Sequence, residues 1–145
     1  MACLPRVKLQ RLVPEARIPR RATSGSAYYD VFSAVGIILW PGKTYLVTTG
    51  WLIEVPTGWF LDIRPRSGMA SKGVTVNNAP GTVDADYRGR LMIILHNHDT
   101  VAWSIMVGDR IAQVALMPVV RCEFVERKSL SRTSRGGNGY GSTER

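Results

Sequence analysis

Short runs of apolar and β-branched residues, each bounded by glycine, proline, asparagine or aspartate, recur about every 8–12 residues along most of the chain. Hardly any segment has apolar residues at helical spacing over three turns, and residues 67–72 (SGMASK) are the best candidate for a short helix. The pattern therefore predicts an all-β sandwich, barrel or jelly roll, in which closed or double sheets hide most of the strand edges.

Individual strands and loops follow from the same pattern. Residues 7–13 (VKLQRLV) are largely apolar at alternate positions, which predicts a strand with one buried face. Residues 14–26 are rich in proline, arginine, serine and glycine and are expected to form a loop. Residues 31–40 (VFSAVGIILW) are expected to form a strand that runs into a turn at residues 41–43. Residues 111–125 repeat the strand pattern.

The length of 145 residues indicates one domain with a single hydrophobic core. With 45% apolar and 21% charged residues, the bulk of the chain is expected to fold. Beyond Ser129 the residues are mostly serine, glycine, arginine and threonine, which bury too little apolar surface to offset the chain entropy. We therefore expect a β domain over residues 1–130, with its first strand inside the basic segment 1–22, and a mobile arm over residues 131–145.

The net charge of +8 is unevenly distributed along the chain. Residues 1–22 hold six basic residues and one acidic residue, residues 23–120 hold seven of each, and residues 121–145 hold six basic and three acidic residues. The middle of the chain is therefore neutral, and the basic ends are expected either to be solvated or to contact polyanions loosely. No aromatic residue is interleaved with the basic residues of the first segment, so we expect no specific nucleic-acid partner.

Cys3 and Cys122 stand far apart, which favours neither a zinc site nor a disulfide scaffold and is compatible with a reducing compartment. The longest apolar runs are about ten residues, roughly half the length that a membrane span requires. The N-terminus has no apolar core of signal-peptide length. These features predict a soluble intracellular protein, in the cytoplasm or the nucleus, without a membrane partner.

Residues 64–72 (RPRSGMASK) carry two arginines, a lysine, two serines and a glycine around the start of the expected helix. Backbone N–H groups at a helix start, with hydroxyl and guanidinium groups nearby, form an anion site suited to phosphates. A polar turn without a ligand is the alternative.

Residues 77–89 (NNAPGTVDADYRG) carry two carboxylates, Asp84 and Asp86, and one aromatic ring, Tyr87. One of the carboxylates is suited to orient a water beside a phosphorus centre, and the ring offers a stacking face. Asx residues that only bond their own backbone in a turn are the alternative.

Residues 135–143 (RGGNGYGST) form a glycine-rich arm with an arginine, two hydroxyl residues and one aromatic ring. Such an arm can close over a nucleotide, with backbone N–H and hydroxyl groups on phosphate and the ring on a base. A disordered tail is the alternative when this segment is taken alone. Taken together, the three segments provide phosphate donors, a carboxylate and aromatic faces, which is the inventory of a small-nucleotide site.

The order and spacing of five segments resemble the five motifs of the trimeric dUTP pyrophosphatases, the dUTPases. The segments are residues 25–34 (GSAYYDVFSA), 65–70 (PRSGMA), 81–89 (GTVDADYRG), 108–113 (GDRIAQ) and 135–143. The resemblance implies a jelly-roll subunit that assembles as a homotrimer, with active sites at the subunit junctions and a C-terminal arm from another chain over each. It also implies hydrolysis of dUTP to dUMP and pyrophosphate with Mg²⁺.

The resemblance also implies roles for individual residues. Asp84 resembles the general base that orients the attacking water, Tyr87 the ring under the deoxyribose, and Asp30 the carboxylate that holds metal-bound waters. Asn78 and the backbone around Gly81 correspond to the groups that read the uracil edge. The remaining implied substrate contacts are Arg66, Ser67, Gly68, Gln113, Arg135, Tyr140, Gly141, Ser142 and Thr143. Asp109 is expected to pair with Arg66 and fix its direction.

The chain departs from the family pattern at a few positions. Tyr28 stands where the first motif usually has glycine, which is expected to add bulk beside Asp30, and Tyr140 stands where the arm usually has phenylalanine. The other departures are Met69, Asn138 and Glu144. None of them removes the carboxylate, the phosphate turn or the arginine of the arm.

Two other functions are compatible with this fold. The dCTP deaminases share it, but they use a catalytic glutamate, and residues 91–99 (LMIILHNHD) carry none. A non-catalytic relative that keeps the fold as an interaction module is the alternative from another class. Release of pyrophosphate from dUTP distinguishes these functions.

Overall fold

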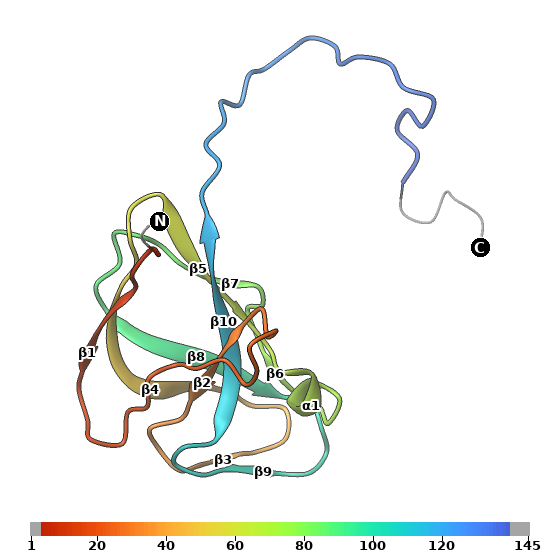
Figure 1. Ribbon diagram of the computed structural model, residues 1–145. Coiled ribbons are helices and arrows are strands. Elements are labelled where there is room, and N and C mark those ends of the chain that lie inside the picture. Colours follow the sequence, from red (N-terminus) through yellow and green to blue (C-terminus); the bar gives the residue numbers. More distant parts are fainter. Residues whose placement is uncertain (1–3, 140–145) are drawn as a thin grey trace.

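The computed structural model describes residues 4–139, and Cys3, Tyr140, Gly141, Ser142, Thr143 and Glu144 lie outside them. Within these residues the fold consists of two four-stranded antiparallel sheets and a two-stranded one (Figure 1). The first sheet has the order β1 (Lys8–Arg11), β4 (Thr44–Glu54), β8 (Arg90–Asn97) and β6 (Val74–Val76). The second has the order β2 (Tyr29–Phe32), β10 (Arg110–Pro118), β5 (Trp59–Arg64) and β7 (Gly81–Val83). The third pairs β3 (Ile37–Leu39) with β9 (Trp103–Ile105). The all-β expectation is confirmed.

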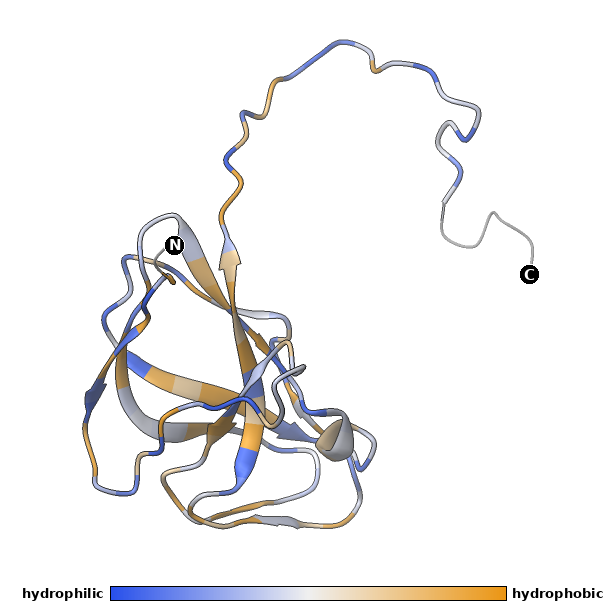
Figure 2. Ribbon diagram, in the orientation of Figure 1, coloured by the Kyte–Doolittle hydropathy of each residue, from blue (hydrophilic) through white to orange (hydrophobic). Residues whose placement is uncertain are grey.

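The hydrophobic core lies between the two larger sheets. On β8, Leu91, Ile93 and Leu95 are buried, whereas the intervening Met92 and Ile94 are partly exposed. This period of two is the pattern of a strand with one face against a core. Figure 2 shows the apolar residues along the strands of both sheets. The core therefore leaves the outer faces of the sheets available for polar groups.

The expected strand over residues 31–40 is wrong as a single element. β2 ends at Phe32 and β3 begins at Ile37, in a different sheet. Between them, the Ser33 amide donates to the Asp109 carbonyl at 2.8 Å and the Ala34 amide donates to the Thr48 carbonyl at 3.0 Å. These bonds take the chain from one sheet to the next, which a continuous apolar run cannot indicate.

The expected short helix is confirmed as α1 (Ser67–Ala70), a single turn that Met69 anchors in the core. No helix among residues 4–139 has the length and apolar character needed to cross a membrane.

The segment after β10 leaves the folded body (Figure 1). The strand pattern of residues 111–125 continues past the end of β10 at Pro118, but residues 119–125 pair with no strand of the described part of the chain. Val120 and Phe124 are 87% and 96% exposed. Apolar side chains of this segment are thus exposed to solvent.

Candidate active site

Five of the expected ligand residues line one open pocket of about 350 Å³, which we call the anion pocket. Its members come from β2, from the turn and helix after β5, and from β10: Asp30, Arg66, Ser67, Gly68 and Gln113. The loop before β2 completes the wall with Ala22, Ser26, Ala27 and Tyr28, and Arg110 lines it beside Asp30. The tertiary structure therefore brings together residues from three of the five motifs.

An ion-pair network holds the anion pocket in shape. Arg66 donates from Nε to Asp30 Oδ1 at 3.0 Å, and Arg110 Nη1 lies 3.6 Å from Asp30 Oδ2. Gln113 donates from Nε2 to the Pro65 carbonyl at 2.9 Å, which ties β10 to the turn before α1. Charge-assisted bonds of this kind orient the guanidinium groups and leave further N–H donors for an anion.

The expected pairing of Asp109 with Arg66 is wrong. Asp109 Oδ2 accepts from the Met106 backbone amide at 2.8 Å, and the partner of Arg66 is Asp30. Asp109 lies in the turn between β9 and β10, where an aspartate readily accepts from its own backbone. Asp30 points across the face of the second sheet, a position that only strand order decides.

The helix start supplies the polar backbone of the pocket. Ser67 and Gly68 are exposed, because Met69 takes the buried side of the single turn. Arg66 is the N-cap residue and makes no side-chain cap hydrogen bond. The amides of Met69 and Ala70 both donate to the Arg66 carbonyl. The amides of Ser67 and Gly68, which precede them, have no intrahelical partner and can serve as anion donors.

Three other expected residues line a second pocket of about 280 Å³, which we call the hairpin pocket: Asn78, Asp84 and Tyr87. They lie in the turn between β6 and β7 and in the turn between β7 and β8. The first of these turns contains a cis peptide bond between Ala79 and Pro80. The pocket also includes Leu46, Met92 and Ile94 on the outer face of β4 and β8.

Two glycines beside the hairpin pocket, Gly81 and Gly89, lie where a side chain would press against neighbouring atoms. A Cβ at Gly81 would stand 3.2 Å from Asn78 Nδ2 and 3.3 Å from Ile63 Cβ, so the Asn78 amide lies directly against the Gly81 backbone. A Cβ at Gly89 would overlap the ring and hydroxyl of Tyr87, whose Oη donates to the Arg90 carbonyl at 2.9 Å. The Tyr87 ring therefore packs against the Gly89 backbone in the same turn, with one face exposed.

Asp84 is exposed at the end of β7 and takes part in none of the ion pairs within residues 4–139. Its backbone carbonyl accepts from the Tyr87 amide at 3.2 Å, which forms the turn. An exposed carboxylate beside an amide and a ring has the chemistry of a water-orienting base next to a nucleoside subsite.

The two pockets share no lining residue. Arg135 lies in the segment that has left the body, where its Nε donates to the Asn138 carbonyl at 2.8 Å. The carboxylate of Asp84 and the guanidinium of Arg66 thus lie in different pockets, and Arg135 lines neither of them.

A third cluster borders the anion pocket and was missed from the sequence. Tyr28 donates from Oη to Asp62 Oδ2 at 2.7 Å, and Arg64 donates from Nε to the same oxygen at 2.8 Å. The hydrogen bond to the Asp62 carboxylate raises the pKa of Tyr28 above its usual value. The alternation of polar residues in LDIR (61–64) is the signal that identifies the outward face of β5. The bulk of Tyr28 is directed to Asp62, not to Asp30.

Fold and pockets together define a class of protein: an all-β sandwich that carries guanidinium and backbone donors for a phosphorylated ligand, and a separate carboxylate with an aromatic neighbour. Comparisons with known proteins identify the family within this class. A model of the dUTPase family matches residues 14–144. The chain belongs to the dUTPase family.

Individual relatives agree with this assignment over nearly their full length. The deoxyuridine 5'-triphosphate nucleotidohydrolase of Nautilia profundicola is 44% identical over 139 residues, which cover 95% of this chain and 98% of that protein. The protein of the same name from Hydrogenobaculum sp. is 45% identical over 137 residues, which cover 93% and 95%. Among solved structures, the dUTPase of Staphylococcus bacteriophage 80alpha with dUpNHpp has a TM-score of 0.85 at 26% identity and covers 96% of this chain and 98% of that one.

Proposed function

We propose that the anion pocket binds the triphosphate and that the hairpin pocket holds the deoxyuridine and the attacking water, the two pockets coming from different subunits of a homotrimer. The chain is an enzyme of nucleotide metabolism that hydrolyses dUTP. One observation supports the assignment of different roles to the two pockets. Asn78, Asp84 and Tyr87 line one pocket, whereas Arg66, Ser67 and Gln113 line the other.

In this proposal Asp84 orients a water for attack on the α-phosphorus and accepts its proton. The exposed position of the carboxylate after β7 leaves room for that water. A positioned carboxylate can accept that proton as a general base. The bond to the bridging oxygen breaks as the water adds, and pyrophosphate leaves with dUMP as the other product.

The anion pocket stabilises the charge that grows on the leaving pyrophosphate. Arg66 is held by Asp30 through Nε and retains donors on its two Nη atoms. The backbone at Ser67 and Gly68 and the amide of Gln113 add neutral donors around the same space. Preorganised donors of this kind, aimed where charge develops, are the largest contribution to most phosphate chemistry.

The residues of the anion pocket fit Mg²⁺ as a partner of the substrate phosphates. No group of three or more histidine, cysteine, aspartate or glutamate residues gathers within the described residues 4–139. Mg²⁺ usually keeps several waters and binds through one or two carboxylates together with substrate phosphates. Asp30 is the carboxylate placed to hold such waters. The ion would supply positive charge that screens the phosphate oxygens.

The hairpin pocket accounts for selection of the base and sugar. The Asn78 amide and the backbone at Gly81 offer both a donor and an acceptor, as the uracil edge requires. The Tyr87 ring lies over Gly89 and donates from its hydroxyl to the Arg90 carbonyl. In this proposal the ring offers a flat surface to the deoxyribose and excludes a 2′-hydroxyl. A site that pairs polar edges rejects a mismatched base far more strongly than one that only measures size.

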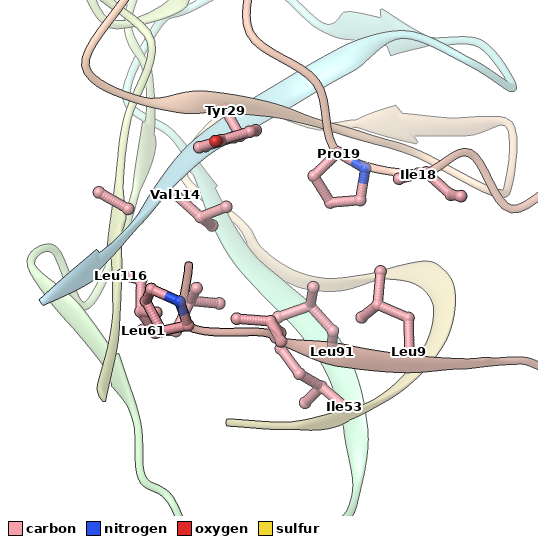
Figure 3. A pocket seen from close by; sticks show the side chains of 12 residues that line it. Leu9, Ile18, Pro19, Tyr29, Ile53, Leu61, Leu91, Val114 and Leu116 are labelled. Carbon is pink, nitrogen blue, oxygen red and sulfur yellow. The ribbon is translucent and has the colours of Figure 1, made fainter. Parts of the chain in front are cut away.

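Assembly is supported by two apolar surfaces that one subunit leaves open. A groove of about 260 Å³ lies between the two large sheets and is lined by apolar side chains from both, including Leu9, Leu61 and Leu91 (Figure 3). The segment over residues 119–125 is partly apolar (Figure 2), and its side chains Val120 and Phe124 are exposed to solvent. A homotrimer in which this segment packs on a neighbouring subunit buries both.

The C-terminal arm completes the proposed site. Arg135 brings a guanidinium, and the residues that the family resemblance assigns to the same task, Tyr140, Gly141, Ser142 and Thr143, lie outside the described residues. In this proposal the arm closes over the bound triphosphate and reopens when the product lacks the β- and γ-phosphates.

Pyrophosphate release from dUTP in the presence of Mg²⁺ tests the function, with Asp84→Asn as the diagnostic variant. We expect kcat to fall by a factor of roughly 10² or more because a positioned base is lost, with dUpNHpp still bound. Asp86→Asn is the matched control, since that aspartate stands in the same turn but lines neither pocket. Near-normal kcat in Asp84→Asn, or an equal loss in Asp86→Asn, contradicts the assignment.

A further inference from the structure

The outer face of the second sheet carries a row of polar residues across three strands. Gln113 on β10 pairs in register with Asp30 on β2 and with Arg64 on β5. Residues directly opposite one another in antiparallel strands share a face, so these three side chains stand in one line. Two of them, Asp30 and Gln113, line the anion pocket.

The Tyr28 side chain lies in the next row of residues on the same face of this sheet. Asp62 on β5 pairs in register with Ala115 on β10, and Tyr29 on β2 pairs with Val114. Because β10 lies between β2 and β5, the Tyr28 side chain crosses β10 at the level of a small residue to reach Asp62. It links two strands that make no backbone contact with each other.

Asp62 holds the Tyr28 hydroxyl in a fixed position because it is itself buried and hydrogen-bonded. Its side chain is only 7% exposed, and one oxygen accepts both from Tyr28 and from Arg64. The Arg64 guanidinium also lies 5.7 Å from the centre of the Tyr28 ring, within the range of a cation–π contact. The tyrosine is therefore held at its hydroxyl and over its ring by the same strand.

The loop that Tyr28 terminates is closed at its base by a backbone bridge between Arg20 and Asp30, and the residues within it have few other ties to the body. Hydrogen bonds of residues 22–27 within the described chain are local, between Thr23 and Ser26 and from Arg21 to the carbonyls of Ser24 and Ser26. Ala22, Ser26 and Ala27 nevertheless form a wall of the anion pocket. The position of that wall depends on the residue at its end.

We propose that Tyr28 is a positioning residue for the phosphate chain of the substrate: through Asp62 it holds the loop over residues 22–28 and so keeps this wall of the anion pocket in place. The inference rests on the proposed role of the anion pocket. It assigns a use to a tyrosine at a position where the family usually has glycine.

The expected kinetic signature is a change in binding and not in chemistry. Tyr28 lines the anion pocket and does not line the hairpin pocket that contains Asp84. Arg66 keeps its own ion pair with Asp30, which does not involve this loop. A wall that loosens therefore weakens the binding of the substrate and of the transition state alike, so KM rises while kcat is nearly unchanged. A role confined to stability would lower the melting temperature and leave KM as it is.

The test compares Tyr28→Phe with Tyr29→Phe. Both remove one hydroxyl, but Tyr29 lines the apolar groove and not the anion pocket. For Tyr28→Phe we expect KM for dUTP and Kd for dUpNHpp to rise about three- to tenfold, with kcat within about twofold of wild type. Tyr29→Phe is expected to leave all three unchanged. Unchanged KM in Tyr28→Phe, or an equal rise in both variants, overturns the proposal.

A double-mutant cycle with Asp62→Ala tests the route. If Tyr28 acts through Asp62, the variant with both Tyr28→Phe and Asp62→Ala binds dUpNHpp no more weakly than Asp62→Ala alone. The Tyr28–Asp62 hydrogen bond is already absent in Asp62→Ala, which also loses the ion pair to Arg64. Additive losses overturn that route. Arg66→Gln separates the inference from the function it rests on: if it leaves dUpNHpp binding intact, the anion pocket itself is misassigned. If it weakens binding and Tyr28→Phe does not, only the role of Tyr28 fails.

Discussion

The hairpin pocket and the anion pocket solve the same problem of positioning side chains by opposite means. Asn78, Asp84 and Tyr87 lie within ten residues of sequence and are placed by two turns and by close contacts with Gly81 and Gly89. The anion pocket instead draws residues from segments 22–30, 66–68 and 110–113 and holds them with ion pairs and a register across three strands.

The difference explains how a site can be divided between subunits. The three functional side chains of the hairpin pocket are placed by two turns close in sequence, although the walls of the pocket also include residues of β4, β5 and β8. Their arrangement relative to one another is therefore local, and they can face a neighbouring chain. A pocket built by the sheet register exists only where the whole sandwich is folded. The two pockets also differ in charge. Two arginines flank Asp30 in the anion pocket, whereas the hairpin pocket presents the carboxylate of Asp84.

The largest expected effect is on base discrimination, which only the hairpin pocket should determine. We expect kcat/KM for dUTP to exceed that for dCTP by about 10³ or more, because the cytosine edge reverses a donor and an acceptor. Asn78→Ala should reduce that ratio strongly. Arg66→Gln should lower kcat/KM for both nucleotides and leave the ratio intact. A ratio that changes in Arg66→Gln would show that the pockets do not act separately.

Mixed oligomers test whether the two pockets come from different chains. Subunits with Asp84→Asn keep an intact anion pocket, and subunits with Arg66→Gln keep an intact hairpin pocket. If each site joins one pocket from each of two chains, random mixing makes about a quarter of the sites wild type. We expect pyrophosphate release to recover to about that fraction, more than tenfold above either parent. No recovery after denaturation and joint refolding would place both pockets of a site in one chain.

Removal of the arm tests a region that belongs to neither pocket in one subunit. A chain that ends at Ser134 should lose about 10- to 10²-fold in kcat/KM for dUTP, since the donors of Arg135 and the residues after it are missing. Its melting temperature and oligomer size should stay close to those of the full chain, because none of residues 131–139, the described part of the arm, belongs to the hydrophobic core. Full activity in the shortened chain would exclude a role for the arm.

The smallest expected effect concerns the position of the Tyr87 ring in the hairpin pocket. Gly89→Ala inserts a methyl group where the Tyr87 ring lies and should raise KM for dUTP about two- to tenfold through displacement of the ring. Gly25→Ala is the control, because no atom lies within 4 Å of a Cβ at that glycine. Steady-state kinetics of the two variants measure the difference. Equal KM values would show that the Tyr87 ring does not contact the substrate.

Much of the fold was predictable because strand signals are local. The alternation in residues 7–13 and the helix start at residues 67–72 identified β1 and α1 before any contact was known. The break between β2 and β3 was not predictable, since Ser33 and Ala34 leave the sheet through bonds to Asp109 and Thr48, residues distant in sequence. The end of β10 at Pro118 was missed for the same reason: an apolar pattern does not tell whether a partner strand belongs to the same chain.

The sequence by itself determined the chemical inventory of this protein: the carboxylate in the turn after β7, the arginine and serine before and in α1, and the glycines that let the hairpin close. Turn and helix-start chemistry depends on neighbours a few residues apart, so it can be read along the chain. Only the tertiary structure decided that Asp30 and not Asp109 holds Arg66, and that Tyr28 crosses β10 to Asp62. These partners are 36 and 34 residues apart and meet because strand order and register bring them to one face, which no local pattern encodes.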